Sequence, residues 1–195
     1  FRSRPRRLPA GGPPGHRQAP GPQRPDAMVV LGPRETERVP RQRSGGGGPG
    51  LPLDSLPDGE HGHFHVIKRD AETFHHLVGI ALDQKGLPTR LFTTNQWVTG
   101  EEMIDSATTI KFVKEFEMVV KGRMAPVSNW VGALIHLFSA EIEKLIVERD
   151  QKIALLVAEY GNRQLILNSR KHHVLTDCKI DLLGRLSENL LVVNS

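Results

Sequence analysis

The sequence predicts an α+β fold: a small antiparallel sheet over about residues 61–95, packed by two or three helices over about residues 100–160. Three observations predict it. Residues 61–68 alternate side chains as a strand does. Residues 77–94 contain two apolar runs around the turn residues 83–86, which is typical of a hairpin. From Pro126 onward, apolar residues recur at helical spacing.

Residues 1–57 form a leader of very different composition. They hold 12 of the 14 prolines and 10 of the 19 glycines, and ten arginines against four acidic residues give them a net charge of +6. Such a segment cannot bury a core, so we expect a disordered leader. The chain begins at Phe1, and this composition is typical of GC-rich DNA read upstream of a start site or out of frame. We therefore expect the leader to be an artefact, with no structure even after the candidate start Met28.

Residues 58–195 form the predicted single globular domain, with 16 basic and 18 acidic residues and a net charge of −2. An acidic balance makes nucleic acid an improbable partner of this domain. The sequence has no apolar run of about 18 residues, so we expect no membrane partner. Its single cysteine, Cys178, fits a reducing compartment, and we expect a cytoplasmic protein.

The first strand and its neighbours follow from local patterns. Phe64 and Val66 share one strand face, and the other carries His61, His63, His65 and Ile67. We expect a short helical turn over residues 71–76. Residues 77–92 fit either a helix ending at Gly86 or a hairpin, and the turn residues favour the hairpin, with Pro88 starting the return strand.

The later elements are predicted from capping signals and periodicity. Thr99, with Glu102 and the pair Val98 and Met103, fits a capping box and staple that begin a helix. Residues 110–120 fit helix and strand about equally. The helix from Pro126 extends toward Gly161 with a break near Asp150, or else residues 153–167 form a hairpin. The tail favours a short helix over residues 180–186.

Four phrases in the sequence resemble an uncharacterised bacterial protein family, a domain of unknown function. They are GEHGHFH (59–65), LVGIALDQKG (77–86), LFTTNQWVTGE (91–101) and WVGALIHLF (130–138). The similarity covers roughly residues 58–185. The resemblance implies domain limits and a bacterial origin. It implies no activity.

The histidine-rich strand is the first candidate site. Neighbouring histidines at alternate strand positions lie about 6.5–7 Å apart, and a His-x-His pair can bind Zn²⁺ or Fe²⁺. We therefore predict a metal site on His61, His63 and His65. Candidates for an additional ligand are Glu60, His75, His76, His172, His173, Asp177 and Cys178. The structural interpretation is that these histidines only hydrogen-bond within a sheet face.

A second candidate site follows the return strand, where Thr94, Asn95 and Trp97 lead into the predicted helix start. Polar groups there could orient a small ligand. Two functions are therefore predicted. One is a small-ligand or metal-binding domain, extending to a metal-dependent enzyme. The other is a non-catalytic accessory or protein-interaction domain with structural histidines.

Overall fold

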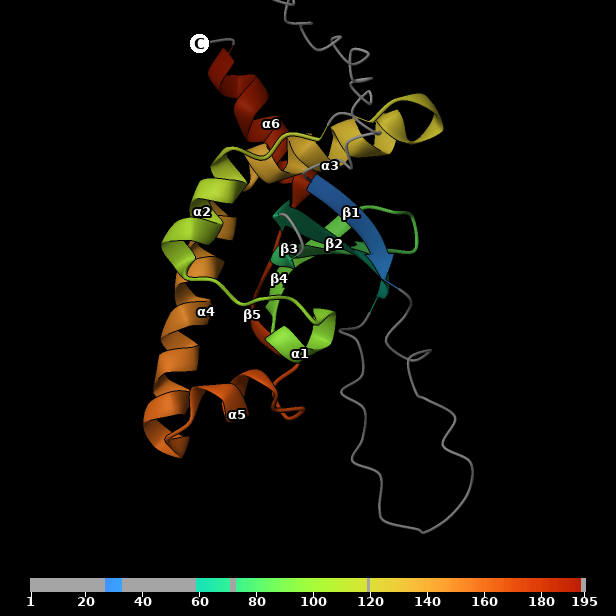
Figure 1. The fold of residues 1–195 in the computed structure, drawn as a ribbon. Helices are drawn as coiled ribbons and strands as arrows, with labels where there is room; N and C mark the ends of the chain where they lie inside the picture. Colours follow the sequence, from blue (N-terminus) through green and yellow to red (C-terminus); the bar gives the residue numbers. More distant parts are fainter. Residues whose placement is uncertain (1–26, 33–58, 71–72, 119, 194–195) are drawn as a thin grey trace, which may run out of the picture.

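The computed structural model describes residues 27–32, 59–70, 73–118 and 120–193. An antiparallel sheet of five strands lies at its centre, with helices packed along one side (Figure 1). The predicted α+β class is confirmed. Among the described residues, no helix has both the length and the apolar character that a bilayer crossing requires.

The sheet is a meander in which each strand pairs with the next along the chain. Its strands are β1 (Ala27–Gly32), β2 (Glu60–Asp70), β3 (Thr73–Asp83), β4 (Pro88–Thr94) and β5 (Val174–Lys179). The predicted hairpin is correct, because β3 and β4 pair around a turn at residues 84–87. In that turn, the Asp83 carboxylate accepts the N–H groups of Lys85 and Leu87.

The beginning of β3 differs from the prediction. The expected helical turn over residues 71–76 is wrong, because β3 begins at Thr73 and pairs with β2 from there. Pairing with a neighbouring strand outweighs the weak local preference for a helical turn.

Strand β1 belongs to the segment that we expected to lack structure. It pairs with β2 from Ala27↔Lys68 to Gly32↔His63. The expectation is therefore wrong for these six residues. A free sheet edge presents unpaired main-chain groups, so a short apolar segment can add to it by backbone hydrogen bonds. The rest of the leader lies outside the described residues.

The helices follow in the order α1 (Gln96–Thr99), α2 (Ser106–Lys114), the 3₁₀ helix η2 (Gly122–Met124), α3 (Ala125–Leu137), α4 (Ser139–Tyr160), α5 (Arg163–Leu167) and α6 (Leu182–Val193). The open choice between helix and strand for residues 110–120 is resolved as helix for residues 110–114, the end of α2, while residues 115–118 form neither.

The predicted helix start at Thr99 is wrong. Asn95 caps the short helix α1, which ends at Thr99, and Gly100 follows with φ +73°. That left-handed conformation suits glycine and terminates a helix. The next helix begins six residues later, with Asp105 accepting the N–H of Thr108.

The break in the long helical stretch lies at Phe138, between α3 and α4, and not near Asp150. Asp150 does not interrupt α4. Its carboxylate accepts the N–H of Ser106, which lies in another helix, and so does not compete for the main-chain groups of α4. The hairpin interpretation of residues 153–167 is also wrong, since α4 runs to Tyr160 and ends at Gly161 as expected. In the tail, α6 covers much of the predicted helix, whereas β5 was not predicted.

The main core lies between one face of the sheet and the helices α2, α3 and α4. The sheet contributes Val66, Leu77, Val78, Ile80 and Leu91. The helices contribute Val113, Val131, Leu134, Ile135, Phe138, Ile142, Leu145 and Ile146. Because successive side chains of a strand point to opposite faces, the intervening residues of these strands lie on the other face of the sheet, which carries the candidate site.

Candidate functional site

The opposite face of the sheet gathers a group of histidines, which we call the histidine face; it comprises His63, His65, His76, Phe92 and Thr94. His63 and His65 alternate along β2 and are 8% and 5% exposed. Their ring centroids lie 4.8 Å apart in an edge-to-face arrangement. The structure therefore brings together two of the three predicted metal ligands.

The third predicted ligand, His61, is exposed near the start of β2. The register with β3 shifts between Glu60 and Gly62. This irregularity interrupts the strict alternation on which the three-histidine prediction depended.

His76, a candidate additional ligand from β3, lies beside His65 instead. Val66 pairs with Val78 but Ile67 pairs with His76, so Leu77 is an extra residue that forms a β-bulge. Without the bulge, strand alternation would point His76 toward the helices. With it, His65 Nδ1 and His76 Nε2 lie 3.0 Å apart, and their ring centroids lie 5.0 Å apart.

Thr94 extends this pair into a hydrogen-bonded chain. Its hydroxyl lies 3.3 Å from His76 Nδ1, on the opposite side of the ring from His65. Both ring nitrogens of His76 therefore have partners. Burial, followed by the neighbouring charges of His65 and Arg149, lowers the pKa of His76 well below its usual value, so the ring is neutral at pH 7.

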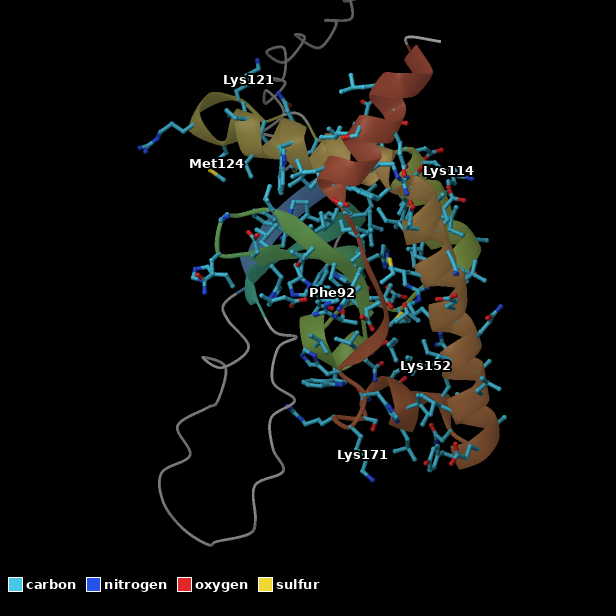
Figure 2. All side chains as sticks on the ribbon, turned by 180° about the vertical axis from the view of Figure 1, so that it is seen from behind. Phe92, Lys114, Lys121, Met124, Lys152 and Lys171 are labelled. Carbon is cyan, nitrogen blue, oxygen red and sulfur yellow. The ribbon has the colours of Figure 1, made fainter. Side chains whose placement is uncertain are left out.

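Phe92 packs against both histidines of β2. Its ring centroid lies 5.8 Å from that of His63 and 5.9 Å from that of His65. The ring can lie across β3 only because residue 79 is glycine: a Cβ there would lie 2.3–2.6 Å from three Phe92 ring carbons. Figure 2 shows Phe92 in the interior of the molecule, whereas Lys121 and Met124 project at its periphery.

Glu101 approaches His76 from the loop between α1 and α2. Its carboxylate accepts the main-chain N–H of His76 at 2.5 Å and is 4% exposed. Burial raises the pKa of Glu101 to about 8, although the hydrogen bond from His76 and the charge of Arg149 oppose the shift. The sequence indicated no such role, because residues 99–103 resembled a helix start.

The side chains of the predicted ligand site have different surroundings. Thr94 belongs to the histidine face. Asn95 is fully buried; it caps α1 with its oxygen and donates to the Ile166 carbonyl. Trp97 donates its indole N–H to the His172 carbonyl and packs against the His173 ring. Asn95 and Trp97 thus fasten the α5–β5 connection to the end of β4.

The remaining candidate ligands lie in other contacts. His75 donates to the Glu102 carbonyl and stacks on Phe112. Glu60 forms a buried ion pair with Arg90 at 2.6 Å. Cys178, a free thiol, is half-buried against the main core, and burial raises its pKa. Across the described part of the chain, no three His, Cys, Asp or Glu side chains are arranged as a metal-binding group.

The histidine face nonetheless brings two imidazole nitrogens to a separation near the one that a shared metal ion requires. Two imidazole nitrogens bound to one tetrahedral zinc ion lie about 3.3 Å apart, and their ring centroids lie about 5.2 Å apart. The nitrogens of His65 and His76 are 3.0 Å apart, and the ring spacings of 4.8 and 5.0 Å along His63, His65 and His76 are similar.

Comparisons with known proteins give one result. A family model described as a domain of unknown function, DUF6969, matches residues 53–180. Neither a curated protein nor a solved structure matches the chain. The match covers most of the chain, including β2 to β5 and the whole histidine face. The chain therefore belongs to the DUF6969 family.

Proposed function

We propose that the domain binds a transition metal ion, Zn²⁺ or Fe²⁺, on the histidine face, with His65 and His76 as two ligands and His63 as the third. The observation that supports it is the 3.0 Å separation of His65 Nδ1 and His76 Nε2. Imidazole is a favoured ligand of both ions. When bound, such an ion supplies Lewis-acid chemistry, which would extend the role to that of a metal-dependent enzyme.

The protein around these nitrogens has the features of a metal site. A hydrogen bond to the distal nitrogen of a ligating histidine fixes its tautomer, and Thr94 supplies that contact to His76. The neutral state of His76 leaves the other nitrogen able to ligate. Phe92 restricts the orientation of His63 and His65 through edge contacts.

Elemental analysis of the purified protein tests the proposal. We expect stoichiometric zinc or iron in the wild type and its loss in the His65→Ala/His76→Ala double variant. His61→Ala is the matched control, because His61 is exposed on the same strand, and it should retain the metal. Metal-free wild type whose unfolding is unchanged by a chelator and by added Zn²⁺ or Fe²⁺ would refute the proposal.

A second candidate function is that of a non-catalytic interaction domain whose histidines are structural. The hydrogen bonds that join His76 with His65, Thr94 and Glu101 favour it, because they satisfy the ring nitrogens and the main-chain N–H of His76 within the chain. In this case the His65→Ala/His76→Ala variant loses stability, and no purified form contains metal. Small-ligand binding by Thr94, Asn95 and Trp97 stays a prediction.

The environment of the protein is part of the proposal. We place it in the cytoplasm, because the chain has one cysteine and a reducing compartment suits a free thiol. We also propose that the folded domain does not bind nucleic acid, since residues 58–195 carry a net charge of −2. A gel-shift experiment at low salt checks the second statement: retardation of duplex DNA or RNA by this domain would contradict it.

A further inference from the structure

The loop at residues 100–105 takes the place of a strand beside the first part of β3. The pairing of β3 with β4 runs from Gly79↔Phe92 to Leu82↔Pro88 and includes no earlier residue of β3. There the loop supplies the hydrogen bonds. The Glu102 N–H donates to the Phe74 carbonyl, and the Glu101 carboxylate accepts the N–H of His76.

This replacement occurs next to the bulge that orients His76. Because β4 does not pair with this part of β3, the His76 N–H lacks a partner from β4, and a buried N–H without an acceptor costs about 1–3 kcal/mol. The Glu101 carboxylate, at 2.5 Å, accepts this N–H. Since the bulge decides which face His76 occupies, the same hydrogen bond favours the position of its imidazole beside His65.

The loop is itself held firmly at its other end. Arg149 of α4 is 2% exposed and donates to the Ile104 carbonyl. Asp150, the next residue, accepts the N–H of Ser106. Glu101 thus reaches β3 from a segment anchored to the long helix, which restricts where its carboxylate can lie.

We infer that Glu101 is a positioning residue for the metal site: its carboxylate holds the bulge in β3 and so presents His76 to a metal ion shared with His65. This inference rests on the proposed function. We do not expect Glu101 to ligate the ion, because its carboxylate faces the main chain of His76. Hydrogen-bonding partners of this kind typically change metal affinity about 10–100-fold.

The test compares substitutions that remove or keep the hydrogen-bond acceptor. Glu101→Met keeps the length of the side chain without an acceptor, whereas Glu101→Gln keeps an oxygen near the same place. Glu102→Met is the matched control, because Glu102 is exposed and its known contacts are made by main-chain atoms. Zn²⁺ affinity is measured by competition with a chromophoric chelator, and circular dichroism reports the fold.

We expect Glu101→Met to weaken Zn²⁺ binding about 10–100-fold, while Glu101→Gln and Glu102→Met stay within a small factor of the wild type. If Glu101→Met does not fold, Glu101→Asp replaces it, because the shorter side chain keeps the carboxyl group but withdraws the acceptor from His76. Wild-type affinity in the folded Met or Asp variant would overturn the inference, as would equal weakening by Gln.

A second measurement separates this inference from the proposed function. Imidazole ¹⁵N spectra of the protein in chelator report the tautomer and hydrogen bonding of His76 without metal. We expect Glu101→Met to alter the His76 signals and Glu101→Gln to preserve them. If the wild type binds no Zn²⁺, the proposed function fails while these spectra still report on the positioning role. Unchanged His76 signals in Glu101→Met would refute that role.

Discussion

At the scale of single residues, the histidine face depends on a glycine. Gly79 pairs with both His65 and Phe92, and the absence of a side chain there allows the Phe92 ring to cross β3. The ring then contacts both imidazoles of β2. A small residue on the central strand therefore determines how large residues on its two neighbours meet.

Gly79→Ala tests this dependence. The added methyl group would collide with the Phe92 ring, and forced repacking of this kind typically costs about 1–3 kcal/mol. Urea denaturation should show that loss. Gly62→Ala on β2 is the control, since an added Cβ there meets nothing within 4 Å. Equal stability of the two variants would show that Phe92 is not constrained by Gly79.

The buried pair of Glu101 and His76 predicts a pH dependence in metal-free protein. Burial raises the pKa of Glu101 from 4.5 to about 8, so its contribution to stability is present below pH 4.5 and is lost as pH rises through 8. The pKa of His76 is lowered, so its contribution is present above pH 6.5 and is lost as pH falls. Of these two groups, only Glu101 therefore changes the stability of the fold between pH 6.5 and 8.

We expect the free energy of unfolding to fall across that range, by at most about 1.4 kcal/mol per pH unit. Glu101→Gln should remove this slope, because an amide does not ionise. Urea denaturation at several pH values between 6.5 and 8, with chelator present, measures both proteins. The same slope in both would mean that another group titrates there.

At the scale of elements, glycines have different roles in the two long helices. Gly161 follows α4 with φ +77°, a conformation that costs other residues about 1–2 kcal/mol. Gly132 lies within α3, and neither glycine has an atom within 4 Å of an added Cβ. Backbone conformation alone should therefore decide how an alanine substitution at each glycine changes stability.

Gly161→Ala should lower the free energy of unfolding by about 1–2 kcal/mol, and Gly132→Ala should raise it by about 0.5–1 kcal/mol. Thermal or urea unfolding of the two single variants provides the comparison. Shifts in the same direction would contradict the assigned helix limits, since Gly161 would then not have a left-handed backbone.

Elements set by local chemistry could be predicted from the sequence, and those set by distant partners could not. The β3–β4 hairpin was predicted because Asp83 and Gly86 are typical turn residues. Thr99 was misinterpreted because Thr-Gly-Glu-Glu fits both a helix start and a glycine after a helix end. Strand β5 was missed because its ladder with β4 joins residues 80 to 89 positions apart.

The candidate site shows the same limit. Alternation along β2 correctly grouped His63 and His65. In β3, where His75 and His76 are adjacent, the bulge at Leu77 decides which of them reaches that face, and the bulge depends on pairing with β2. Glu101 contacts His76 from 25 residues away, through a loop whose course depends on α4. No local pattern in the sequence predicts either feature.

At the scale of the whole molecule, the sheet divides two environments. One face joins α2, α3 and α4 in an apolar core. The other buries imidazoles, a threonine and an aromatic ring. Buried polar groups are costly unless they are paired, so such a face is retained either for a ligand or for a satisfied network. The proposed metal site assigns the first role to it.

X-ray absorption spectroscopy of the zinc-loaded protein tests that assignment most directly, because it reports the type and number of atoms bound to the ion. We expect imidazole nitrogens at about 2.0–2.1 Å from the ion, with one fewer in His76→Ala and an unchanged set in His61→Ala. A zinc spectrum identical in the wild type and in the His65→Ala and His76→Ala variants would contradict it. So would a wild-type protein that takes up no zinc.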